Sequence, residues 1–200
     1  MQGLDLASYL VMYYPSFCEQ FLEFGGVTLI INRGLLMCRK ASLLLRTMEV
    51  VSHLTRISKA YYPLVQKVNP CQAMSRILRN PDPHVRAEAC KLVGNLSRHS
   101  DFFYKDFQQT KICMQLVPLC HDRDDNVRKW AAFAVGNAAF HSGLLYGELA
   151  DAVPMLHVRF RMQNFVLNKI LLSCRLNQRI RTHSSNSYVI CQKIVVVING

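Results

Sequence analysis

Apolar residues recur at intervals of three and four along much of the chain, which is the spacing of one face of an α-helix. Between Val127 and Ala139 they form one broad helical stripe, with polar residues at the positions in between. A second stripe of the same kind runs from Val85 to Leu96. The pattern predicts one long helix over each stretch.

Shorter helical segments precede the second of these stripes along the chain. The range 101–110 has a periodic aromatic face, and Asp101 is its candidate N-cap. The range 111–122 again has apolar residues at helical spacing. A polar turn follows, in which Asp124 or Asp125 would cap the long helix with a charge that favours a helix start. The order is helix, helix, turn, long helix.

Prolines and glycines punctuate the earlier part of the chain in the same way. Pro70 suits the first turn of a middle helix, while Pro81 and Pro83 mark a turn and the start of the next helix. The pair Gly25 and Gly26 predicts a helix end followed by a new apolar helix.

The two long stripes are parts of an internal repeat. Residues of the same type stand 42 positions apart at Val85/Val127, Arg86/Arg128, Ala89/Ala131, Gly94/Gly136, Asn95/Asn137, His99/His141, Ser100/Ser142 and Tyr104/Tyr146. A weaker echo lies one period earlier, at Leu54, Arg56 and Tyr62. So many matches in one register indicate a true repeat.

We divide residues 1–156 into repeats at 17–58, 59–100 and 101–142, with a partial repeat at 143–156. Three helices in about 42 residues is the size of armadillo and HEAT units, whose apolar faces are buried by stacking. The expected fold is therefore all-α: an armadillo/HEAT-like helical solenoid of about three and a half repeats, with an irregular C-terminal tail.

The period is lost near His157. The range 157–200 contains seven Lys or Arg and no Asp or Glu, and two of its segments read as a basic amphipathic helix and as a strand-like apolar run. We interpret this range as a basic, non-repeat tail, disordered or an alternative terminus. The alternative is a patch that binds a membrane surface or nucleic acid.

Charge and cysteine content add little to this picture. The net charge is +11, and removing the tail's +7 leaves +4 for the first 156 residues, so the repeats are only mildly basic. No run approaches the roughly 20 apolar residues of a membrane span, and no signal peptide is recognisable. The eight cysteines show no zinc-type spacing and are expected to be reduced, buried thiols of a cytoplasmic protein. We expect no metal and no cofactor.

The Gly-Asn pairs carry a resemblance. The stretches AEACKLVGNLS and WAAFAVGNAAF are similar to the ends of the third helices of armadillo repeats. The resemblance implies that Asn95 and Asn137 line a groove, where such carboxamides hydrogen-bond a peptide backbone. The alternative is that both asparagines bond locally within the stack. The candidate partner-binding residues are Asn95, Asn137, Lys91, Phe133, Trp130 and His53.

Other repeated residues have structural interpretations. His99 and His141 come at helix ends and are expected to cap free carbonyls. Arg86 and Arg128 are expected to pair with acids such as Asp82 or Asp125. Trp130 and Phe133 serve either core packing or partner contact.

A narrower resemblance covers residues 81–156. The motifs RHSDFFY and FAVGNAAFHS resemble the C-terminal armadillo-type region of the Fused family of serine/threonine kinases. The resemblance implies a scaffold for protein partners, kinesin-like ones included, in Hedgehog signalling and cilium assembly or in cytokinesis. The kinase loop and catalytic motifs are absent, so the chain is not expected to be an enzyme. The remaining alternative is a basic module that binds nucleic acid or a membrane surface.

Overall fold

A computed structural model describes residues 2–149 of the chain. Residue 1 and the range 150–200 lie outside the described residues. The basic tail expected at 157–200 falls in that range, as does the end of the partial repeat.

The described residues are helical almost throughout and contain no strand, which confirms the all-α prediction. The elements in chain order are α1 (Gln2–Tyr13), α2 (Pro15–Glu23), α3 (Gly26–Ile30), the π-helix η1 (Ile31–Leu36), α4 (Ala41–Ile57), the 3-10 helix η2 (Lys59–Tyr61), α5 (Tyr62–Gln66), α6 (Cys71–Ile77), α7 (Pro83–Leu96), α8 (Tyr104–Thr110), α9 (Ile112–Leu119), α10 (Asp125–Ala138), the 3-10 helix η3 (Gly143–Leu145) and α11 (Tyr146–Leu149).

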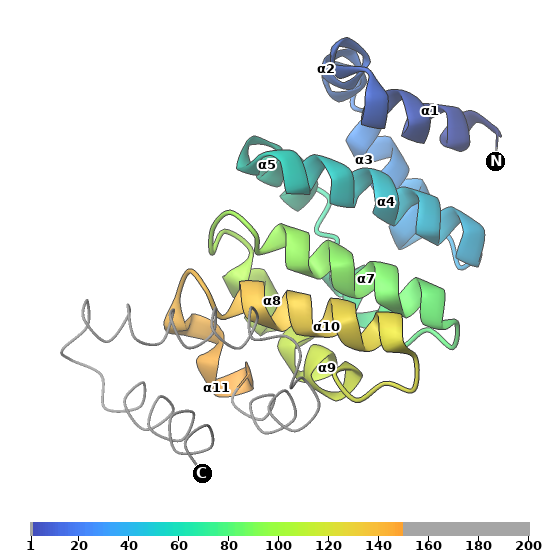
Figure 1. Cartoon of the computed structure of the whole chain (residues 1–200). Helices are drawn as coiled ribbons and strands as arrows, with labels where there is room; N and C mark the ends of the chain where they lie inside the picture. Colours follow the sequence, from blue (N-terminus) through green and yellow to red (C-terminus); the bar gives the residue numbers. More distant parts are fainter. Residues whose placement is uncertain (1, 150–200) are drawn as a thin grey trace.

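Four of these helices stack side by side in the order α1, α4, α7, α10 (Figure 1). The last three end the stretches 17–58, 59–100 and 101–142, so each is the third helix of its stretch. The shorter helices, such as α6, α8 and α9, pack behind them. The element order repeats because the apolar stripes recur every 42 residues.

The long helices begin where their caps predict. The Asp82 carboxylate accepts a hydrogen bond from the His84 backbone N–H at 2.9 Å, with Pro83 in the first turn of α7. The Asp124 carboxylate accepts from the backbone N–H groups of Asn126 and Val127 at the start of α10. Each bond satisfies an N–H that has no partner inside the helix. Of the two candidates for α10, Asp124 is therefore the cap.

The cap expected at Asp101 is wrong. The helix α8 begins three residues later, Phe103 stands at its N-cap position, and no side chain caps it. The backbone carbonyl of Asp101 instead accepts from the N–H of Tyr104, which forms a turn. The aromatic residues override the local capping preference because Phe103 and Tyr104 are both fully buried.

A left-handed glycine separates α2 from α3, as the Gly25-Gly26 pair predicts. Gly25 has φ = 71°, a conformation that costs glycine little because it has no Cβ. Gly26 then starts α3, packed closely against the ring of Phe21. The chain can therefore turn sharply between the first and second helices of this stretch.

The stack is closest where α7 meets α10. A Cβ added to Gly94 would lie 2.5 Å from ring carbons Cδ1 and Cε1 of Phe133, and 3.2 Å from the Cα of Ala134. The facing positions on α10 include Ala131 and Ala134, both fully buried. Small residues on both helices bring the two backbones together.

Candidate functional site

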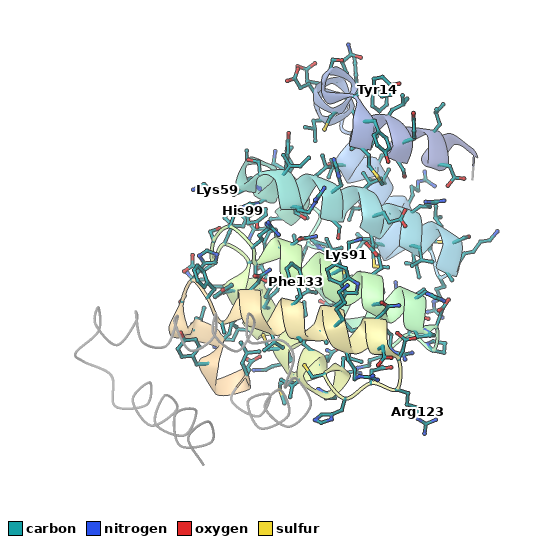
Figure 2. The ribbon with its side chains drawn as sticks, in the orientation of Figure 1. Tyr14, Lys59, Lys91, His99, Arg123 and Phe133 are labelled. Carbon is teal, nitrogen blue, oxygen red and sulfur yellow. The ribbon has the colours of Figure 1, made fainter. Side chains whose placement is uncertain are left out.

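The outer surface of α7 and α10 carries a cluster of a lysine and two aromatic residues, labelled in part in Figure 2. We call this cluster, Lys91, Trp130 and Phe133, the third-helix face. The rings of Trp130 and Phe133 meet edge to face, with centroids 5.5 Å apart. The Lys91 ammonium lies 5.5 Å from the centre of the Trp130 ring, within cation–π range. All three side chains are half-buried, so they are held in place and still present surface to a partner.

Two neighbouring charges belong to this face but were not among the sequence candidates. The Lys129 ammonium lies 5.4 Å from the centre of the Trp130 ring. The Glu88 carboxylate pairs with Lys91 at 3.0 Å. Burial raises the pKa of Glu88, and the Lys91 charge partly offsets this effect. Only the i, i+3 spacing of Glu88 and Lys91 on one helix indicated this pair in the sequence.

The charges on the neighbouring helix α4 are already paired. Arg46 bridges Asp5 of α1 and Glu49 of its own helix, each at 2.9 Å. Here a partner would meet neutralised ion pairs, whereas on α7 and α10 it would meet aromatic surface and lysines.

The structure places the two candidate asparagines inside the stack. Asn95 and Asn137 are each 2 % exposed. The Asn137 side-chain amide donates to the backbone carbonyl of Gly94 at 2.9 Å, and that of Asn95 donates to the carbonyl of Ser52 at 3.3 Å. Each bond joins a third helix to the third helix before it, 43 residues earlier. The amide N–H groups that were candidates for a peptide ligand are thus directed at the neighbouring repeat.

Two buried tyrosines hold the other end of each repeat, a role that the sequence indicated only through their 42-residue spacing. The Tyr62 hydroxyl donates to the carbonyl of Asn95 at 2.7 Å, and the Tyr104 hydroxyl to that of Asn137 at 2.8 Å. Each oxygen also accepts a backbone N–H, from His99 at 3.2 Å for Tyr62 and at 3.3 Å in the second case. Burial raises the pKa of both tyrosines, so they remain neutral donors.

The histidines cap helix ends, as predicted, but each caps the helix of the preceding repeat. Nε2 of His99 lies 2.9 Å from the carbonyl oxygen of Arg56, and Nε2 of His141 lies 3.0 Å from that of Arg98. Helix C-termini leave carbonyls without partners, and these rings reach them across the repeat boundary.

The expected partner of Arg86 needs correction. Arg86 does not pair with Asp82, which caps α7. Its guanidinium forms two parallel hydrogen bonds of 2.8 Å with the Asp122 carboxylate of the next repeat. Bidentate pairing suits two planar groups. Arg128 pairs with Asp125, as expected.

The sixth candidate, His53, lies on α4 and is half-buried. Its Nδ1 is 3.5 Å from Nη2 of Arg56. Burial, and then the Arg56 charge, lowers its pKa. It is one repeat position before Asn95 and is not in the cluster of Lys91 and Trp130.

The thiols and the cavity offer no chemistry of their own in the range 2–149. The six cysteines described are unpaired, and burial raises the pKa of Cys113 and Cys120 to about 12. No group of three or more possible metal ligands occurs in this range. A cavity of about 340 Å³ next to α1 and α4 has an almost wholly apolar lining. None of the described helices is long and apolar enough to cross a membrane.

Comparison with known proteins agrees with this geometry. No family model and no curated protein matches the chain. Among solved structures, an engineered protein matches with a TM-score of 0.76 at 16% identity, covering 99% of this chain and 89% of that one. A designed armadillo repeat protein in complex with the peptide (KR)4 matches with a TM-score of 0.72 at 14% identity, covering 99% and 92%. Computationally designed armadillo repeat proteins for modular peptide recognition match with a TM-score of 0.64 at 12% identity. The chain therefore has the fold of an armadillo-like helical solenoid.

Proposed function

We propose that this chain is a non-catalytic scaffold that binds a segment of another protein on its third-helix face. The observation that carries the proposal is the cluster of Lys91, Trp130 and Phe133. A tryptophan held edge to face and flanked by two ammonium groups is a preorganised contact, and aromatic residues dominate the binding energy of protein interfaces. The likeness to designed peptide-binding repeat proteins supports the same reading of the fold.

The asparagines contribute indirectly under this proposal. Because Asn95 and Asn137 bond the preceding helix, they keep α4, α7 and α10 in register. The register sets the distance between Lys91 on one helix and Trp130 on the next. Partner contact then falls to the half-buried side chains and stacking to the buried amides.

We further propose that the chain represents the repeat region of a Fused-type kinase. The motifs RHSDFFY and FAVGNAAFHS support this assignment through sequence resemblance over 81–156. On this proposal its partners are signalling or kinesin-like proteins, and it works in the cytoplasm, at the cytoskeleton or cilium.

The test compares partner capture by the whole chain and by Lys91→Ala/Trp130→Ala. We expect the double variant to lose its partners while its circular dichroism spectrum and melting temperature stay close to those of the wild type. Met114→Ala is the matched control, because Met114 is an exposed apolar residue on α9, away from this face. Capture that survives the double substitution would place binding on another surface. Kinesin-like proteins among the Trp130-dependent partners would support the Fused assignment, and their absence would count against it.

A further inference from the structure

A second surface runs along one edge of the stack, at the loops that follow α4, α7 and α10. We call residues 56–60, 98–102 and 140–144 the loop edge. The three loops lie side by side on the same side of the molecule (Figure 1), and Figure 2 labels Lys59 and His99 close together there. This edge is distinct from the third-helix face of Lys91 and Trp130.

The loops are tied to one another by the repeat bonds. The histidine caps join the first loop to the second through Arg56 and the second to the third through Arg98. Within the loops, the hydroxyl of Ser58 accepts the N–H of Ala60, and that of Ser142 accepts the N–H of Leu144. The backbone of the loop edge is therefore fixed, and its side chains project from defined positions.

The loop edge carries positive charge that the fold does not neutralise. Arg56, Lys59 and Arg98 are exposed, as is Lys105 just beyond the second loop. None of the four makes an ion pair with another residue of the range 2–149. The only acid in the three loops is Asp101.

Apolar side chains are exposed between these charges. Ile57 is 54% exposed, Leu144 41%, Phe102 39% and Phe140 37%. The Phe102 ring is held by Tyr62, with ring centroids 5.9 Å apart, and by a second neighbouring ring at 5.1 Å. The Phe140 ring meets His141 at 4.9 Å. Apolar surface mixed with unpaired cations is typical of an interface.

We propose that the loop edge docks an extended acidic peptide. Arg56, Arg98 and Phe140 occupy the same repeat position in successive loops, 42 residues apart. Packed helices lie about 8–10 Å apart, and an extended chain advances about 3.3 Å per residue. Three peptide residues therefore span one repeat. The ligand carries an acid, a second acid three residues later and an apolar residue three residues after that, in either chain direction.

The apolar composition of the edge favours a peptide over nucleic acid. Single-stranded nucleic acids stack their bases on open aromatic faces, whereas Phe102 is already in contact with two other rings. The remaining apolar residues, Ile57 and Leu144, are aliphatic and suit aliphatic or aromatic side chains of a peptide.

The test uses the whole chain and a fluorescein-labelled peptide with Asp at one position, Asp three residues on and Phe three residues after that. Fluorescence anisotropy should show binding that weakens with added salt. A peptide of the same composition with the two Asp residues adjacent should bind more weakly. The variant Arg56→Glu/Arg98→Glu should lower the affinity by about tenfold, since each substitution turns an attraction into a repulsion.

The matched control is Arg79→Glu/Arg123→Glu. These residues are exposed and lie in the turns before α7 and α10, at the opposite end of the long helices, where Figure 2 labels Arg123. This control changes the net charge equally and should keep the wild-type affinity. An equal loss in both double variants, or equal binding of the two peptides, would overturn the proposal. So would binding of oligouridine RNA or of phosphatidylserine vesicles, with loss in Arg56→Glu/Arg98→Glu, when the peptide itself does not bind.

Discussion

The side chain of Asn137 connects two helices that are distant in the sequence. The carbonyl of Gly94 lies in the last turn of α7, where carbonyls lack partners within the helix, and the Asn137 amide donates to it. Buried carbonyls without a donor are costly. The recurrence of Asn at this position thus has a packing explanation.

We expect Asn137→Ala to lower the free energy of unfolding by about 1–3 kcal/mol, because it leaves a buried carbonyl unsatisfied. Urea denaturation followed by circular dichroism measures the change. Asn126→Ala is the control: its side chain is exposed in the first turn of the same helix, and we expect a change below about 0.5 kcal/mol. Equal stability of Asn137→Ala and wild type would show that the amide is not part of the stacking.

At the scale of elements, the packing of α7 on α10 depends on the missing side chain of Gly94. An alanine there would improve helix propensity by about 1 kcal/mol. Its Cβ would also lie 2.5 Å from the Phe133 ring and 3.2 Å from the Cα of Ala134. The ring can move, but the backbone of α10 cannot move without disturbing the stack, so the clash outweighs the gain in propensity.

We predict that Gly94→Ala destabilises the protein by about 1–3 kcal/mol, as overpacking typically does. Thermal melting measures the effect. Gly3→Ala should not destabilise, since nothing lies within 4 Å of the added Cβ. In a double-mutant cycle, Phe133→Ala should remove part of the penalty of Gly94→Ala. Additive effects of the two substitutions would contradict this contact.

A second link between elements is the pair of Arg86 on α7 and Asp122 in the turn before α10. Burial alone would raise the pKa of Asp122, but its hydrogen bonds with Arg86 outweigh this and lower it. The unfolded chain holds this carboxyl near its ordinary pKa of about 3.9. The native state therefore binds fewer protons, and the pair stabilises it above pH 4 and loses that effect as the pH falls through the lowered pKa.

Asp122→Asn should therefore cost about 1–3 kcal/mol at pH 7, and its difference from wild type should shrink below about pH 4. Urea denaturation at several pH values measures this. Asp101→Asn serves as the control because Asp101 is exposed and forms no ion pair with a described residue. A difference that is constant from pH 7 to pH 3 would argue against the pair as its cause.

At the scale of the whole molecule, stability passes from each helix of the stack to the next. The third helices α4 and α7 each pack between two others, whereas α1 packs on α4 alone among them. The outer side of α1 leaves Leu6, Tyr9 and Tyr13 more than half exposed. In a repeat stack each unit is stabilised by its neighbours, so a helix with one neighbour opens more readily.

We predict that backbone amides of α1 exchange with deuterium faster than those of α7. Mass spectrometry of peptic peptides measures this difference. The Asn137→Ala variant should accelerate exchange in α10 more than in α1, because the lost bond joins α10 to α7. Uniform exchange across α1, α4 and α7 would indicate that the chain unfolds as a single cooperative unit.

Much of the fold follows from local sequence because the signals are local. The caps at Asp82 and Asp124 and the turn at Gly25 need only nearby residues. The prediction at Asp101 is wrong because burial of Phe103 and Tyr104 decides where α8 begins. At the candidate site, aromatic residues near the Gly-Asn pair could be identified in the sequence, but the part of Lys129 could not, since its contact with the ring depends on side-chain placement.

The amino-acid sequence by itself determined the repeat. A period of 42 residues, apolar stripes and helix caps are properties of the chain alone, and they specify an all-α stack. Only the tertiary structure decided what the repeated polar residues do. The amide of Asn95 bonds a carbonyl 43 residues earlier, and Arg86 bonds an acid 36 residues later. Such partners depend on how the helices lie against one another, because hydrogen bonds act over about 3 Å and no local pattern records which distant group comes that close.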